Sequence, residues 1–292
     1  MRVAVIGNPA AGGGAEDPLE PVERALREAG AEVSLRRSEG GDLTDEARRA
    51  AEECDVVAAL GGDGTVNAVA TALAGTPTPL LVLPAGTLNH FAKDLGVPLD
   101  LAGAALLVRD GTRRTVDAAE VNGRLFVNNS SIGAYPLAVA LRERLQEESG
   151  GGKWTAMSRA ALRTFRRFPT VHVRIASDEG EIGLETPFVF VGNNVYGGEG
   201  VKPGERARLD AGLLGVVTTE ATTRRQAVGL ALRAALGRLD SAAGVWQGET
   251  AELTVETTAP SLLVSLDGEV VRLETPLAYR SLPGALVVLA PS

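Results

Sequence analysis

The chain has 292 residues, which suggests two domains of about 150 residues each, and its 45% hydrophobic and 23% charged residues are typical of a globular protein. A net charge of −8 argues against a general nucleic-acid-binding protein, because such proteins need a basic surface. One cysteine and two histidines exclude an internal disulfide framework and argue against a zinc site of the usual ligands.

Residues 1–117 alternate between short apolar runs and segments with helical periodicity. Strands are expected at 2–6, 33–35, 55–60 and 80–83. Helices are expected from residue 18 to the glycine at 30, from a cap at 42 or 44 to about 53, at 66–73 and at 101–108. Such alternation is typical of a parallel sheet covered by helices. Prolines and glycines interrupt the uncharged stretch 64–92, so it does not resemble a membrane span, and we expect a soluble, cytoplasmic protein.

Residues 118–281 have a different character, because their strand candidates mostly follow one another directly. Asn122-Gly123 lies between two apolar runs and predicts a two-residue hairpin. One helix is expected at about 223–236, and further strands at 171–176, 188–192, 214–219, 253–256, 262–266 and 270–273. We therefore expect an α/β domain with a parallel sheet over 1–117 and an antiparallel, β-rich, sandwich-like domain over 118–281. A cleft would separate them, and residues 282–292 would return to the first domain.

Three glycine-rich loops, at 8–14, 61–65 and 84–89, each follow an expected strand. In a parallel sheet the carboxyl ends of the strands open onto one edge, where α/β proteins bind their ligands. Glycines let backbone N–H groups approach a ligand closely, and a helix N-terminus favours anions. Each loop taken singly is also explained as an ordinary tight turn, and none is a P-loop or a Gly-x-Gly-x-x-Gly motif. Together they favour phosphate binding.

The run Gly61-Gly62-Asp63-Gly64-Thr65-Val66-Asn67 resembles the signature of the diacylglycerol kinase catalytic domain family, which includes bacterial lipid kinases, sphingosine kinases and ceramide kinases. The segments 8–12, 84–92, 129–133 and 266–269 also match this family in order and spacing. The resemblance covers essentially the whole chain. It implies an α/β nucleotide-binding domain, a β-sandwich-like second domain, and ATP with Mg²⁺ in the cleft between them.

The resemblance also implies roles for individual residues. It assigns the ATP contacts to Asn8, Pro9, Ala10, Ala11, Gly12, Ser38, Gly62, Asp63, Gly64, Thr65, Val66, Asn67, Ala68 and Thr87. Glu269 corresponds to the general base, with Asp267 beside it, and Asp63 is the third catalytic candidate. Two alternatives stay open, because Asp-Gly between apolar strands is typical of a type I′ hairpin and Asp63 could stabilise its own turn.

The chain departs from the family pattern at three positions. Ala68 and His90 stand where the family usually has acids. Ala211 replaces an aspartate that ligates a structural Mg²⁺ in bacterial relatives, so that metal site is in doubt unless Asp210 substitutes for it. The Mg²⁺ that accompanies ATP is not affected by this change.

The resemblance favours an ATP-dependent lipid kinase that phosphorylates a hydroxyl of a diacylglycerol-like acceptor. An NAD kinase is the alternative enzyme, but that family uses an Asn-Glu pair and this chain contains none. A nucleotide-binding regulatory module without turnover would explain Ala68 and Ala211, whereas the presence of Asp267 and Glu269 argues against it. Neither the acceptor lipid nor the oligomeric state follows from the sequence.

Residues 153–174 carry six basic residues and no acid, and on a helix the arginines and the aromatic residues would lie on opposite faces. One interpretation is a peripheral contact with an anionic membrane surface, because basic residues are attracted to such lipids. The other is a surface helix whose aromatic face packs on the core while its arginines stay in water. Both interpretations remain open from the sequence.

Overall fold

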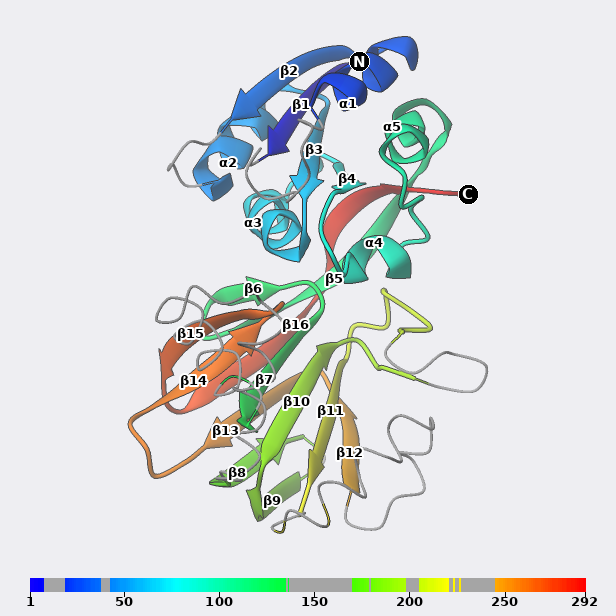
Figure 1. Ribbon diagram of the computed structural model, residues 1–292. Coiled ribbons are helices and arrows are strands. Elements are labelled where there is room, and N and C mark those ends of the chain that lie inside the picture. Colours follow the sequence, from blue (N-terminus) through cyan, green and yellow to red (C-terminus); the bar gives the residue numbers. More distant parts are fainter. Residues whose placement is uncertain are drawn as a thin grey trace.

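The computed structural model of the protein describes residues 1–7, 19–37, 43–134, 136, 170–178, 180–197, 205–220, 223, 226 and 245–292. They form an α/β part and a β-rich part, drawn one above the other in Figure 1. The long strands β5 (Thr112–Val121) and β16 (Leu277–Ala290) run from one part into the other.

The α/β part follows the alternation expected from the sequence. Its elements are β1 (Arg2–Gly7), α1 (Leu19–Glu28), β2 (Glu32–Arg37), α2 (Leu43–Glu53), β3 (Val56–Gly61), α3 (Asp63–Leu73), β4 (Leu80–Pro84), α4 (His90–Asp94) and α5 (Leu101–Asp110). Strands β1 to β4 pair in parallel in the order β2-β1-β3-β4. Strands β3 and β4 are buried along their whole length, which is why each is a continuous apolar run.

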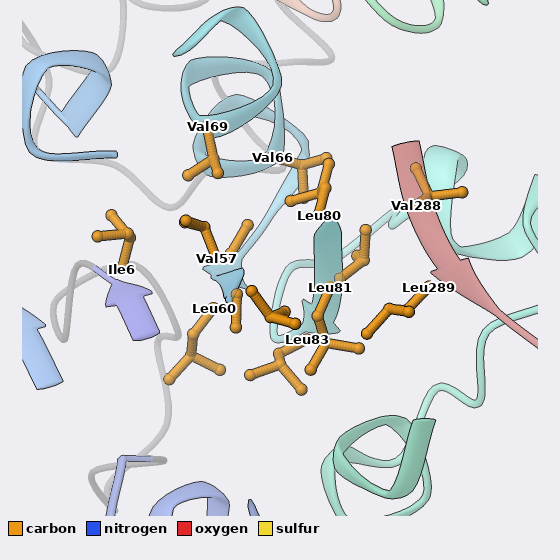
Figure 2. Close-up of a cluster of buried hydrophobic side chains, with 14 of the residues drawn as sticks. Ile6, Val57, Leu60, Val66, Val69, Leu80, Leu81, Leu83, Val288 and Leu289 are labelled. Carbon is orange, nitrogen blue, oxygen red and sulfur yellow. The ribbon is translucent and has the colours of Figure 1, made fainter. Parts of the chain in front are cut away.

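The core of the α/β part lies between this sheet and its helices. Figure 2 shows Val66 and Val69 of α3 packed toward side chains of β3 and β4, together with Val288 and Leu289 of β16. Helix α3 turns its apolar stripe to the sheet, and its first turn therefore lies at the carboxyl end of β3. This packing fixes the position of the second glycine-rich loop.

The β-rich part contains short strands that mostly pair antiparallel. They are β6 (Arg124–Phe126), β7 (Asn129–Gly133), β8 (Val171–Ser177), β9 (Gly180–Thr186), β10 (Phe188–Asn193), β11 (Leu214–Thr219), β12 (Val245–Thr250), β13 (Glu252–Glu256), β14 (Ser261–Leu266) and β15 (Glu269–Glu274). Within the described ranges, one antiparallel sheet has the order β12-β11-β10-β7-β14-β15. A second, mixed sheet continues from β4 through β16, β13 and β8 to β9. The expected fold class is confirmed, with the addition that the mixed sheet runs through both parts.

Strands β5 and β16 connect the two hydrophobic clusters. Ala118 belongs to the cluster of the α/β part and Ala119 to that of the β-rich part. The pairing of β5 with β16 shifts register between Leu282 and Leu286, and Asp117 accepts hydrogen bonds there from the backbone N–H of Gly284 and of Gly212. The boundary expected between residues 117 and 118 falls within β5, and the domain limits themselves stay a prediction.

Some elements differ from the sequence-based expectation. Helix α3 begins at Asp63, so most of the second glycine-rich loop is the first turn of a helix. Strands β9 and β12 were not expected, because each lies at the edge of a sheet and is too exposed and polar to form an apolar run. The helix expected at 223–236 lies outside the described residues except for two positions. None of the helices in the described ranges combines the length and the apolar character needed to cross a bilayer.

Candidate active site

A cavity of about 980 Å³ lies between the two parts of the molecule. Its upper wall comes from α3 and the β4–α4 loop, and its lower wall from the β5–β6 and β14–β15 hairpins. The predicted contact residues that line it are Gly62, Gly64, Thr65, Asn67, Ala68 and Thr87. Val66 lies in the same segment, but its side chain is buried in the core (Figure 2). The predicted contacts at 8–12 and Ser38 lie outside the described residues.

Part of the upper wall is bare backbone, contributed by Gly62, Gly64 and Gly86. Gly62 precedes α3 and no side chain caps the helix there, so the N-terminus of α3 remains available to an anion. The β4–α4 loop lies directly against it, because a Cβ placed on Gly86 would come within 2.4 Å of the Gly62 Cα. Only glycine permits this approach of two backbones. The two loops therefore form one continuous backbone surface.

Asp63 and Asn89 hold the upper wall together. The Oδ1 atom of Asp63 accepts a hydrogen bond of 2.9 Å from the backbone N–H of His90, the first residue of α4. Asn89 has a φ of 51°, and its amide both accepts from the N–H of Gly86 and donates to the C=O of Gly86. Asp63 thus supports the neighbouring loop. From the sequence, we had considered that it stabilises a turn within its own segment.

Asn67 places an unused acceptor in this wall. Its Oδ1 atom is buried and meets no hydrogen-bond donor among the described residues. A buried polar atom without a partner is costly, so it indicates a ligand group that supplies a donor or a cation there. The glycine surface, the uncapped helix and this oxygen together fit a phosphate-containing ligand that carries a metal ion.

Asp267 lies in the β14–β15 hairpin of the lower wall, where its buried carboxylate holds the hairpin in place. Asp267 and Gly268 have φ values of 48° and 90°, so the expected type I′ hairpin is present. The Asp267 carboxylate accepts hydrogen bonds of 2.8 to 3.0 Å from the backbone N–H groups of Val127, Asn128 and Asn129. Burial raises the pKa of Asp267 to about 6, although these three donors and Arg206 oppose the rise. The hairpin is therefore fixed to the segment 127–129.

Glu269 follows this turn and reaches across the cavity. It is exposed and lines the cavity, and its Oε1 atom would lie 2.9 Å from a Cβ placed on Gly64. Its carboxylate therefore lies against the first turn of α3, in the other part of the molecule. The structure thus brings Glu269 to the Gly62–Thr65 segment, about 200 residues away in sequence.

Arg124 is a cavity residue that the sequence reasoning missed. It follows the turn at Asn122 and Gly123, whose φ values are 47° and 77°. The Asn122 side chain fixes this turn by donating to the C=O of Glu274 and of Pro276 and accepting from the N–H of Ala278. No ion pair engages the Arg124 guanidinium in the described part of the chain. A basic residue beside the glycine surface adds a positive charge, and only the tertiary fold reveals that it faces the cavity.

The segment 209–212 lies away from this cavity. Asp210 is on the surface, where it forms an ion pair with Arg208 at 3.0 Å. The backbone N–H of Ala211 donates to Asn194, and that of Gly212 to Asp117. Across the described ranges, no three His, Cys, Asp or Glu residues are grouped as a metal site would require.

Two family models match the chain. The model described as the diacylglycerol kinase catalytic domain matches residues 2–121. The model described as the YegS C-terminal NAD kinase beta sandwich-like domain matches residues 144–290. Together they account for most of both parts of the molecule.

Individual relatives agree with these matches. A protein of Pseudomonas aeruginosa named as a probable YegS-like lipid kinase is 36% identical over 286 residues, covering 92% of this chain and 88% of the relative. A diacylglycerol kinase of Staphylococcus epidermidis is 33% identical over 204 residues, covering 67% of this chain and 62% of the relative. The crystal structure of a candidate diacylglycerol kinase from Bacillus anthracis has a TM-score of 0.78 at 26% identity, covering 99% of this chain and 96% of that chain. The chain therefore belongs to the diacylglycerol kinase family of lipid kinases.

Proposed function

We propose that the protein is an ATP-dependent kinase that transfers the γ-phosphoryl group of ATP to a hydroxyl of a diacylglycerol-like lipid. The observation that supports this proposal is the position of the Glu269 carboxylate against the first turn of α3. A proton acceptor and an anion-binding helix N-terminus then face the same space, as phosphoryl transfer to a hydroxyl requires.

The upper wall would hold the phosphates of ATP. Backbone N–H groups at Gly62, Gly64 and Thr87 would bind the phosphate oxygens, and Arg124 would neutralise part of their charge. Mg²⁺ bound with ATP supplies further neutralisation of the phosphate oxygens. Residues 8–12 and Ser38 remain predicted nucleotide contacts.

The lower wall would hold the acceptor. Glu269 would take the proton from the lipid hydroxyl while the hydroxyl oxygen forms a bond to the γ-phosphorus and ADP leaves with the electrons of the broken bond. Leu125, Leu266 and Val271 line the cavity on the same side and would contact the apolar part of the acceptor next to its hydroxyl. Asp63 would be a further catalytic residue at the upper wall, where the charge of its carboxylate would act at the first turn of α3. Asp267 would act in support, through the hairpin that carries Glu269.

A phosphoryl-transfer assay with a panel of acceptors tests this proposal. The purified chain would be incubated with radiolabelled ATP, Mg²⁺ and mixed micelles of diacylglycerol, monoacylglycerol, ceramide or sphingosine, with NAD in a parallel reaction. We expect label in the lipid phase, with diacylglycerol or a close analogue preferred. Label in NADP would favour the NAD kinase alternative. NAD is included because the second family model is described as NAD kinase-like. ATP binding without label in any acceptor would favour a regulatory module.

We also propose that residues 153–174 give the enzyme a peripheral contact with anionic membranes. Residues 153–169 lie outside the described residues, so the support comes from their five basic residues in a chain of net charge −8. The sixth, Arg174, lies in strand β8 and forms ion pairs with Glu181 and Glu256, so it does not contribute to this contact. Each basic residue near an anionic surface contributes about 1 kcal/mol. Replacing Arg163 and Arg167 by Glu should reduce sedimentation with phosphatidylserine vesicles and leave activity on a short-chain soluble acceptor intact. Unchanged vesicle binding would eliminate this contact.

A further inference from the structure

Arg206 is a buried cation that lies outside the candidate active site. Its side chain is 0% exposed, and that of its partner Asp94 is 6% exposed. The guanidinium donates to the Asp94 carboxylate at 2.7 and 2.8 Å, and its remaining N–H groups donate to the backbone C=O of Val127 and of Asn193 and to the side chain of Asn128. A guanidinium can join several acceptors in fixed directions because its donors form a rigid planar fork.

The partners of Arg206 belong to different parts of the molecule. Asp94 is the last residue of α4, and the first residue of α4, His90, donates its N–H to Asp63 in the upper wall. Val127 and Asn128 lie between β6 and β7 of the β-rich part, in the segment whose N–H groups bind Asp267, and the Val127 side chain packs in the hydrophobic cluster of the α/β part. Arg206 therefore connects the short helix behind one wall of the cavity to the segment behind the other wall.

These contacts form a continuous path between the two chemical groups of the site. The path runs from the first turn of α3 through Asp63 and α4 to the ion pair, and from there through residues 127–129 to Asp267. Asp267 in turn fixes the hairpin that presents Glu269. Arg206 and its ion pair with Asp94 thus form the point at which this path of contacts crosses from the upper wall to the lower wall.

We propose that Arg206, through its ion pair with Asp94, is a positioning residue that fixes the Glu269 carboxylate relative to the N-terminus of α3. The consequence for catalysis rests on the proposed kinase function, because Glu269 acts there as the proton acceptor. The Arg206 side chain is buried and does not line the cavity. A displacement of about 1 Å between reacting groups can lower the rate by about a hundredfold.

Two variants separate positioning from stability. Arg206→Met leaves Asp94 buried without a partner and is expected to lower both the Tm and kcat. The double variant Asp94→Leu with Arg206→Met removes the buried charges together, and replacing a buried ion pair by apolar side chains is often neutral for stability. It does not restore the hydrogen bonds to residues 127 and 193. Arg280→Met, which removes the Arg280–Glu120 ion pair at 2.7 Å within the β-rich part, is the matched control.

Kinetics and hydrogen–deuterium exchange provide the readouts. In the double variant we expect the Tm to rise above that of Arg206→Met, because no charge stays buried alone, while kcat stays about a hundredfold low and the KM for ATP changes less than about threefold. Exchange in a peptide containing 127–133 should rise in both variants, and exchange in β1 and β3 should not. The control should match the wild type in every measurement, and Arg206→Lys, which keeps the charge but fewer bonds, should have an intermediate kcat.

The outcomes that contradict the proposal are distinct. A double variant that regains kcat along with its Tm would reduce the pair to a stabilising contact, and unchanged exchange at 127–133 would overturn the positioning role. Because exchange needs no substrate, it remains decisive if the wild type phosphorylates no lipid. In that case raised exchange would support the mechanical link, while the proposed kinase function would fail by itself.

Discussion

The two walls of the cavity differ in what they are made of. The upper wall contains an exposed backbone surface, with Gly62 and Gly86 in close contact at the uncapped N-terminus of α3, and its side chains are uncharged. The lower wall presents side chains, Arg124 and Glu269, from the tips of two hairpins. A backbone wall is sensitive to any added atom, because its N–H groups act only at close approach. A wall of side chains is sensitive to replacement of a single charged group, even when the replacement has the same size.

The walls also differ in how they are held. The upper wall is fixed by hydrogen bonds within the α/β part, such as that between Asp63 and the N–H of His90, which are 27 residues apart. The lower wall depends on contacts from distant segments, because Asp267 binds residues 127–129 and Asn122 binds the strand connection near residue 276. Substitutions that alter one wall at a time should therefore give different combinations of lost turnover and lost stability.

Asp63→Ala should have the largest effect, abolishing turnover, because it removes the carboxylate at the first turn of α3. It also removes the acceptor of the His90 N–H, and the loss of such a cap costs about 1 kcal/mol. Asp63→Asn keeps an acceptor and should retain the wild-type Tm while remaining inactive. Phosphate transfer and thermal denaturation check both variants. Near-normal turnover in either would remove Asp63 from the catalytic set.

Glu269→Gln should lower kcat by about 10²–10⁴-fold, since it retains the size of the side chain and removes the proton acceptor. The KM for ATP should change little, because in the proposed arrangement Glu269 acts on the acceptor and the phosphates of ATP contact the backbone of the opposite wall and Arg124. Glu274→Gln at the exposed end of the same strand is the control and should leave kcat unchanged. Full activity of the Glu269→Gln variant would show that this wall contributes no base.

Gly86→Ala should separate the two loops of the upper wall. The added Cβ would lie 2.4 Å from the Gly62 Cα and 2.9 Å from Oδ1 of Asn89. Such overpacking typically costs about 1–3 kcal/mol, and the displaced N–H groups should also weaken ATP binding. Gly183→Ala is the matched control, because nothing lies within 4 Å of its Cβ position. Urea denaturation and ATP titration measure the two effects, and equal behaviour of both variants would contradict the close packing of the loops.

The smallest effect concerns Asp267 and appears in the pH dependence of stability. Its folded pKa of about 6 is above the usual value of 3.8, so the folded state holds its proton to a higher pH than the unfolded state does. Protonation of Asp267 therefore adds to the free energy of unfolding, fully below pH 3.8, and this contribution is lost as the pH rises through 6. The free energy of unfolding should fall by about 1 kcal/mol between pH 5 and pH 7 from this group. Asp267→Asn should remove this decline, whereas Asp210→Asn at the surface should not. A wild-type free energy of unfolding that rises between pH 5 and pH 7 would contradict the raised pKa of Asp267.

Much of the upper wall could be predicted from the sequence. The alternation of apolar runs and helical stripes over residues 1–117 predicted the parallel sheet, and the glycines after β3 and β4 marked the edge at which we expected a ligand site. The predicted start of α3 differed from the observed start by three residues, because glycine and aspartate are poor helix formers whose placement here is decided by packing of Val66 and Val69 on the sheet. The resemblance to the diacylglycerol kinase catalytic domain family, now confirmed, added the candidate residues of the lower wall.

The sequence by itself determined the local features of this protein: the strands that alternate with helices, the positive-φ turns at Asn122-Gly123 and Asp267-Gly268, and the glycines that allow close approach. Only the tertiary structure decided which of these features meet. The mixed sheet continues through β16 and joins the two parts of the molecule, and in the folded chain Glu269 lies against Gly64 while Arg124 lines the same cavity. The physical reason is that backbone conformation depends on neighbours in the chain, whereas contact between residues far apart depends on how complete sheets and helices pack.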